Sequence, residues 1–187
     1  MKTLKTIQTI SKVSKIICEI VFICCLVGGI GCALGIISLA LIPESFKIGD
    51  VTFKNFVEQS ADVSLGTCYA SMAAAIVICA GEAVLAKIAQ KYFVNELKAG
   101  NPFTFDGSKE MMVLGIYTIC IPLGSNIIAS IVYGILKAVL ENVDKFDSDI
   151  LSSVSVGLGI MFVVTGLLCR YGAELKESKE ESKDITE

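Results

Sequence analysis

Four long stretches of apolar residues restrict what this chain can fold into. They run roughly over residues 16–42, 65–89, 111–140 and 150–169, and each holds few charges. A helix needs about 20 apolar residues to cross roughly 30 Å of hydrocarbon, so each stretch is long enough to span a bilayer. We therefore predict an all-α integral membrane protein, with residues 1–187 forming a single four-span domain and residues 170–187 its charged cytoplasmic tail.

The composition agrees with this class and excludes others. The chain is 53% hydrophobic, has a net charge of -3 and contains no histidine. The absence of histidine excludes serine-histidine and cysteine-histidine catalysis and most zinc sites. The small net charge, without a basic stripe, argues against nucleic acid as a partner. We predict that the protein is not an enzyme and that it uses no metal and no cofactor.

The eight cysteines all lie in or at the edges of the apolar stretches. They are Cys18, Cys24, Cys25, Cys32, Cys68, Cys79, Cys120 and Cys169. Disulfides usually staple the exposed loops of small secreted domains. We therefore interpret these cysteines as small apolar packing residues rather than as redox groups or metal ligands.

The distribution of lysine and arginine predicts the orientation of the spans. Positive charges gather before the first span, between the second and third spans, and after the fourth. They are Lys2, Lys5, Lys12 and Lys15; Lys87, Lys91, Lys98 and Lys109; and Arg170, Lys176, Lys179 and Lys183. Because short cytoplasmic segments carry an excess of positive residues, both termini and the middle loop are predicted to be cytoplasmic.

The first outer loop has the alternating pattern of a hairpin. Four apolar residues flank Gly49-Asp50, namely Phe46, Ile48, Val51 and Phe53. A two-residue turn there would pair Ile48 with Val51 on one face. Short connections elsewhere favour antiparallel neighbours. We predict a four-helix antiparallel transmembrane bundle with a small extracytoplasmic β-hairpin in the first outer loop.

Small residues at helical spacing are expected to let the spans approach each other, since packing drives helix association in lipid. They occur on three of the four spans: Gly31 and Gly35 on the first; Gly66, Ala70 and Ala74 on the second; and Ser153 with Gly157, beside Ser155 and Gly159, on the fourth. At the inner side, Gly100-Asn101-Pro102 should end the helix of the second span, and Thr104 or Asp106 should cap the next.

Polar groups inside two spans define a candidate polar interior. Pro122, near the middle of the third span, cannot bond the carbonyl near Thr118, so the helix loses a backbone hydrogen bond and gains flexibility there. A broken helix of this kind can line a binding site in a transporter. Asn126 follows one turn later, and we expect that only other spans or trapped water can supply a partner for its amide. Glu82 ends a long uncharged run in the second span. Ionisable residues in spans are functional candidates by default. The structural alternatives are a proline kink and a glutamate that locks packing, for instance against Lys87.

A second candidate site lies in the predicted cytoplasmic loop. Phe103 and Phe105, beside Pro102, are apolar groups with no obvious burial in lipid or in a core. They are therefore candidates for contact with a partner. The alternative is that these aromatic side chains pack under the bundle as part of the fold of the loop.

Two cytoplasmic stretches resemble the signatures of a known family. They are Leu97-Lys98-Ala99-Gly100-Asn101-Pro102-Phe103-Thr104 and Tyr171-Gly172-Ala173-Glu174-Leu175-Lys176-Glu177. The family is a bacterial four-span membrane family catalogued as the domain of unknown function family numbered twenty-nine seventy-five, and the resemblance covers the whole chain in span count and order. Its members often end in an acidic stretch closed by an aspartate-leucine-threonine-like segment. Asp184-Ile185-Thr186 is similar, but residues 178–183 intervene and Glu187 replaces an apolar end.

The resemblance implies a location and, more weakly, a partner, but no catalytic residue. The location is the bacterial cytoplasmic (inner) membrane, and the partner is a cytoplasmic regulator, because genes of the family often neighbour small helix-turn-helix regulators. Two functions stay open. One is a non-catalytic multi-pass protein that acts by contact with a regulatory or membrane partner. The other is a small transporter or channel for an ion or small solute, which would have to be a homo-oligomer because four spans are few and no inverted repeat is visible.

Overall fold

Four long helices make up most of the structure. The computed structural model describes residues 2–41, 47–48, 51–52, 64–100, 104–140, 143 and 149–184. The helices are α1 (Lys2–Leu41), α3 (Leu65–Ala99), α4 (Phe105–Val139) and α5 (Asp149–Asp184). The described part is therefore almost entirely helical, as the sequence predicted.

Each of the four helices holds a segment long and apolar enough to cross a membrane. These segments are Gln8–Leu41, Leu65–Ala99, Phe105–Val139 and Ser155–Ser178. They indicate a multi-pass membrane protein. The helices extend beyond the predicted spans, since α1 begins at Lys2 and α5 continues to Asp184. A hydrocarbon span ends where charges begin, whereas the backbone hydrogen bonds of a helix continue past that point.

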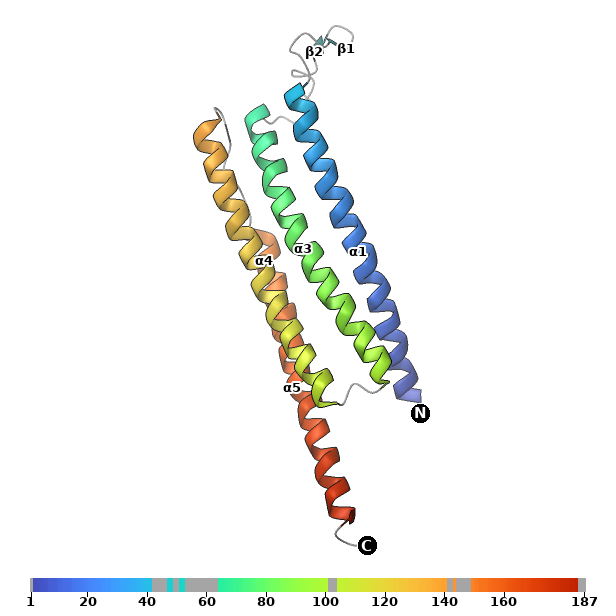
Figure 1. Cartoon of the computed structure of the whole chain (residues 1–187). Helices are drawn as coiled ribbons and strands as arrows, with labels where there is room; N and C mark the ends of the chain where they lie inside the picture. Colours follow the sequence, from blue (N-terminus) through green and yellow to red (C-terminus); the bar gives the residue numbers. More distant parts are fainter. Residues whose placement is uncertain are drawn as a thin grey trace.

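Each helix packs on the next one along the chain (Figure 1). The extensive contacts join α1 to α3, α3 to α4, and α4 to α5. No other pair of helices packs extensively within the described residues. The two ends of the chain lie at one end of this row of helices, here called the inner end, and β1 and β2 lie at the opposite, outer end. The arrangement is consistent with a helical bundle.

Two short strands lie in the first outer loop. β1 (Lys47–Ile48) pairs antiparallel with β2 (Val51–Thr52), with Lys47 opposite Thr52 and Ile48 opposite Val51. The turn at residues 49–50, the residues Phe46 and Phe53, and the stretch 53–63 lie outside the described residues. A hairpin with an apolar face on the bundle therefore stays a prediction.

Residues at the helix ends explain where α3 and α4 begin and end. The Ser64 side chain accepts a hydrogen bond from the Thr67 amide at the start of α3. Gly100 ends α3 in the left-handed region, with φ of 69°, and its amide donates to the Glu96 carbonyl. Thr104 then caps α4 by accepting from the Gly107 amide at 3.1 Å. The predicted boundaries of the inner turn are confirmed.

Small residues form the closest helix contacts. Ala70 and Ala74 of α3 are fully buried against Ala129 and Tyr133 of α4. At the crossing of α4 and α5, a Cβ atom added to Gly115 would lie 2.8 Å from the Gly159 carbonyl oxygen. Helices that associate in lipid depend on such close approach, because lipid chains are as apolar as the helices themselves.

Candidate functional site

The proline in the middle of α4 does not break the helix. α4 is a single helix from Phe105 to Val139, and Pro122 lies buried within it. The broken helix that would line a transport site is therefore not observed, and the structural alternative for Pro122 agrees with the continuous helix. Thr118 is also buried, and its hydroxyl donates to the Leu114 carbonyl at 2.8 Å. This bond does not replace the one lost at Pro122, which frees the carbonyl of Thr118 itself. Packing against neighbouring helices and local backbone adjustment let a membrane helix continue through a proline.

Asn126 bonds its own helix rather than a neighbouring one. Its amide donates to the Pro122 carbonyl at 3.0 Å, and the side chain is half-buried. The Ser125 hydroxyl bonds the Ile121 carbonyl in the same way. The sequence-based expectation is that only other spans or trapped water supply a partner for Asn126. That expectation is corrected, because a carbonyl four residues earlier in the same helix lies within reach of a short polar side chain.

Glu82 lies on α3 at the side that faces α1. It is half-buried and lies close to Cys25 of α1. The expected partner Lys87 lies elsewhere: its Nζ atom donates to Gln90 and lies 4.3 Å from the centre of the Phe22 ring. Within the described residues, no hydrogen bond or ion pair joins Glu82 to Asn126. The four residues of the candidate polar interior therefore do not form one bonded site.

The loop between α3 and α4 is described only in part. Pro102 and Phe103 lie outside the described residues, so their proposed contact with a partner stays a prediction. Phe105, the first residue of α4, is 44% exposed. Its exposure leaves an aromatic side chain available at the inner end.

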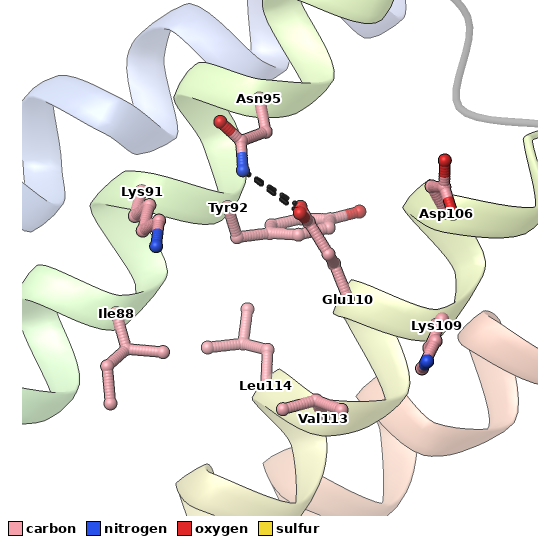
Figure 2. A pocket seen from close by; sticks show the side chains of 9 residues that line it. All are labelled: Ile88, Lys91, Tyr92, Asn95, Asp106, Lys109, Glu110, Val113 and Leu114. Atoms are coloured by element: carbon pink, nitrogen blue, oxygen red, sulfur yellow. Dashed lines mark hydrogen bonds between the residues drawn. The ribbon is translucent and has the colours of Figure 1, made fainter.

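A cleft opens between the inner ends of α3 and α4 (Figure 2). Its volume is about 480 Å³, which is within the range of ligand sites. Four residues of α3 and five of α4 line it: Ile88, Lys91, Tyr92 and Asn95, and Asp106, Lys109, Glu110, Val113 and Leu114. We call this the inner cleft.

A hydrogen bond between two helices crosses the inner cleft. The side-chain amide of Asn95 on α3 donates to the two carboxylate oxygens of Glu110 on α4, at 3.0 and 3.2 Å. Both residues also line a neighbouring cavity of about 210 Å³, which reaches Thr104 and Gly107 at the start of α4. The two cavities thus flank one polar bridge.

Further contacts hold the walls of the inner cleft in place. Tyr92 is buried and packs edge-on against Phe93, with ring centres 5.2 Å apart. Ser11 of α1 is buried, and it lies close to Glu96 of α3. Leu114 is only 2% exposed at the apolar end of the cleft. The wall formed by α3 is thus supported from α1, on the side away from α4.

Analysis of the sequence alone did not identify the inner cleft. Lys91 and Lys109 were used only as indicators of topology, and Asn95 and Glu110 were not considered. A signal was present, because charged residues at helical spacing lie on both sides of the predicted Gly100-Asn101-Pro102 turn. A tight turn between two helices brings the residues that flank it together.

The described residues contain no group of three or more potential metal-ligating side chains. All eight cysteines are free thiols, and none is fully buried. Compared with known proteins, the chain matches no family model, no curated protein and no solved structure. The fold and the inner cleft are therefore the observations on which a function can be argued.

Proposed function

We propose that this chain is a non-catalytic membrane protein that acts by contact through the inner end of its helices. The observation that carries this proposal is the inner cleft, a cavity lined by charged and polar side chains from α3 and α4. Phe105 lies exposed at the start of α4, next to the loop that joins the two helices. In the middle of α4, by contrast, the hydroxyls and the amide bond their own helix.

The proposal includes a location and an orientation. We infer an antiparallel four-helix transmembrane bundle with a β-hairpin in its first outer loop, in the bacterial cytoplasmic membrane, with both termini in the cytoplasm. The positive charges near the inner end support this orientation. The resemblance to the bacterial four-span family supports the location, and its gene neighbourhoods suggest a cytoplasmic regulator as the partner.

The contact proposal is tested by co-purification from native membranes. The intact protein is compared with the double variant Phe103→Ala and Phe105→Ala, and bound proteins are quantified by mass spectrometry. The partner should be lost from the double variant. Tyr117→Ala is the matched control, because Tyr117 is an exposed aromatic residue further along α4. Partners that stay unchanged in the double variant would count against contact through this loop.

The orientation is tested by labelling cysteines from outside intact cells. A maleimide that cannot cross membranes should label Thr52→Cys in the outer loop and leave Ser178→Cys in α5 unlabelled. The parent chain with its native cysteines gives the background. The opposite labelling pattern would reverse the proposed topology.

Glu82 supports a second candidate function, a small oligomeric transporter or channel. It is a half-buried carboxylate in the inner half of the apolar part of α3, and no described residue forms a hydrogen bond or ion pair with it. Groups of this kind carry ions or protons in many transporters. Flux into proteoliposomes under an imposed gradient should then exceed that of empty liposomes and fall in Glu82→Gln. Flux no greater than in empty liposomes would exclude this function.

A further inference from the structure

The inner cleft lies where α3 leaves the apolar part of the membrane. α3 has no charged residue from Leu65 until Glu82, and its first lysine is Lys87. At 1.5 Å per residue, Ile88 follows Leu65 by about 35 Å and Lys91 by about 39 Å along the axis. The hydrocarbon core is about 30 Å thick, so these two residues fall at its inner edge and in the headgroup layer.

The two ends of the inner cleft differ in polarity. Ile88, Val113 and Leu114 gather at one end, and the Asn95–Glu110 bridge lies at the other (Figure 2). The aliphatic end lies toward the middle of the helices, on the side where hydrocarbon is expected. Val113 is 38% exposed there, so an apolar group could rest on it. This polarity fits an amphipathic molecule with its polar group at the inner end.

The polar part of the cleft carries charges of both signs. Lys91 and Lys109 supply positive charges from opposite walls, while Asp106 and Glu110 supply negative charges from α4. The two carboxylates would repel a purely anionic headgroup, and the two lysines would repel a purely cationic one. A headgroup that has a phosphate and a primary ammonium group offers a partner to each.

We propose that the inner cleft binds the headgroup of a zwitterionic phospholipid with a primary amine, such as phosphatidylethanolamine. The phosphate lies against Lys91 and Lys109, the ammonium group lies against Asp106 and Glu110, and an acyl chain covers Val113 and Ile88. Basic pockets between membrane helices are known to bind lipid headgroups, and here the added carboxylates select a zwitterion. The inference rests on the membrane-spanning part of the proposed function, and it does not require a protein partner.

The test uses the full chain in detergent and measures bound lipid by native mass spectrometry. Phosphatidylethanolamine, phosphatidylcholine and phosphatidylglycerol with identical acyl chains are added separately. Phosphatidylethanolamine should bind most tightly. The double variant Lys91→Gln and Lys109→Gln should weaken its binding about tenfold or more, because charge-assisted hydrogen bonds to phosphate are lost. Both lysines are exposed, so these changes leave the packing intact.

Control variants separate the cleft from the general charge of the inner end. Lys98→Gln removes a positive charge from the same end of α3 but not from the cleft, and it should leave binding unchanged. Glu110→Gln keeps an acceptor for Asn95 and removes the negative charge, so it should reduce the preference for phosphatidylethanolamine over phosphatidylglycerol. The readout is independent of the co-purification that tests partner contact.

Three results would overturn the proposal. The first is equal binding of phosphatidylethanolamine to the parent chain and to the lysine double variant. The second is tighter binding of phosphatidylglycerol than of phosphatidylethanolamine to the parent chain. The third is competition by water-soluble glycerophosphoethanolamine at the same concentration as the lipid, which would identify a free solute rather than a lipid as the ligand.

Discussion

The apolar stretch of the helices beyond the inner cleft, here called the middle, and the inner end use different contacts. In the middle, glycine, alanine and serine bring backbones together, as at Gly115 and Gly159, and the polar side chains of α4 bond their own helix. At the inner end, long polar side chains meet between helices, as Asn95 and Glu110 do, and a cleft remains beside them. Small residues close the space between helices, and large polar ones hold it open.

This difference follows from the surroundings of each region. In hydrocarbon a polar group has no water to bond, so a partner in its own helix satisfies it without depending on a neighbour. In the headgroup layer water and lipid headgroups satisfy polar groups, so side chains extend between helices at little cost in free energy. Steric changes should therefore have their largest effects in the middle, and polar changes should have small effects on stability everywhere.

The largest expected effect is at the crossing of α4 and α5. Gly115→Leu places a side chain where the Gly159 carbonyl oxygen and Val163 already lie, so the two helices must separate. We expect a loss of about 3 kcal/mol in the free energy of unfolding, as for severe overpacking. Unfolding of the purified protein in mixed micelles measures it. Gly157→Leu is the matched control, since a Cβ atom at Gly157 meets nothing within 4 Å. Equal losses in both variants would refute the proposed crossing.

A smaller effect is expected where α3 meets α4. A Cβ atom on Gly81 would overlap the Ser125 side chain, so Gly81→Ala should cost about 2 kcal/mol. Ser125→Gly in the same chain should restore part of that loss, because it vacates the space. Gly124→Ala, with nothing within 4 Å, should be neutral or slightly stabilising. Losses from Gly81→Ala and Ser125→Gly that simply add would show that the two residues do not touch.

Much of the fold could be predicted from the sequence because membrane helices have few alternatives. The length of the apolar stretches indicated four helices. Gly100 and Thr104 marked the inner turn, because a helix cap forms hydrogen bonds only with residues close to it in the sequence. Which small residues meet was harder to predict. A Cβ atom added to Gly35 would lie 3.1 Å from the sulfur of Met72 on α3, whereas one added to Gly31 or Gly157 would meet nothing within 4 Å. Gly159, by contrast, lies at the crossing of α4 and α5. Spacing defines a stripe of small residues, but the rotation of each helix depends on all its neighbours.

The candidate site was less predictable for a related reason. Glu82 and Asn126 were selected because polar groups in apolar segments are conspicuous, yet the two are not bonded to each other in the described residues. The inner cleft depends on which side chains meet across two helix ends. Lys91 and Asn95 look like ordinary interfacial residues in sequence, and only their placement opposite Lys109 and Glu110 makes a cavity.

At the inner end, the Asn95–Glu110 bridge should contribute little to stability. A double-mutant cycle with Asn95→Ala and Glu110→Ala should give a coupling of about 0.6 kcal/mol, the usual value for hydrogen bonds between membrane helices. Both residues face the cleft, where water competes for the same groups. A second cycle, with Lys98→Ala in place of Asn95→Ala, gives the baseline coupling energy, because Lys98 does not line the cleft. A coupling above about 2 kcal/mol would mean that the bridge is shielded from water and that the cleft is closed.

The smallest effect is expected from Asn126→Leu in the middle of α4. The amide bonds the Pro122 carbonyl of its own helix, so its removal breaks a hydrogen bond within α4 and not one between helices. Leucine is similar in size and apolar, and the expected change is below about 0.5 kcal/mol in the same unfolding assay. Ser130→Ala, which removes the bond to the Asn126 carbonyl, should behave alike. If Asn126→Leu instead costs more than the Asn95–Glu110 coupling, then the amide also joins α4 to another helix. The contrast between a middle held by close packing and an inner end bridged by polar groups would then fail.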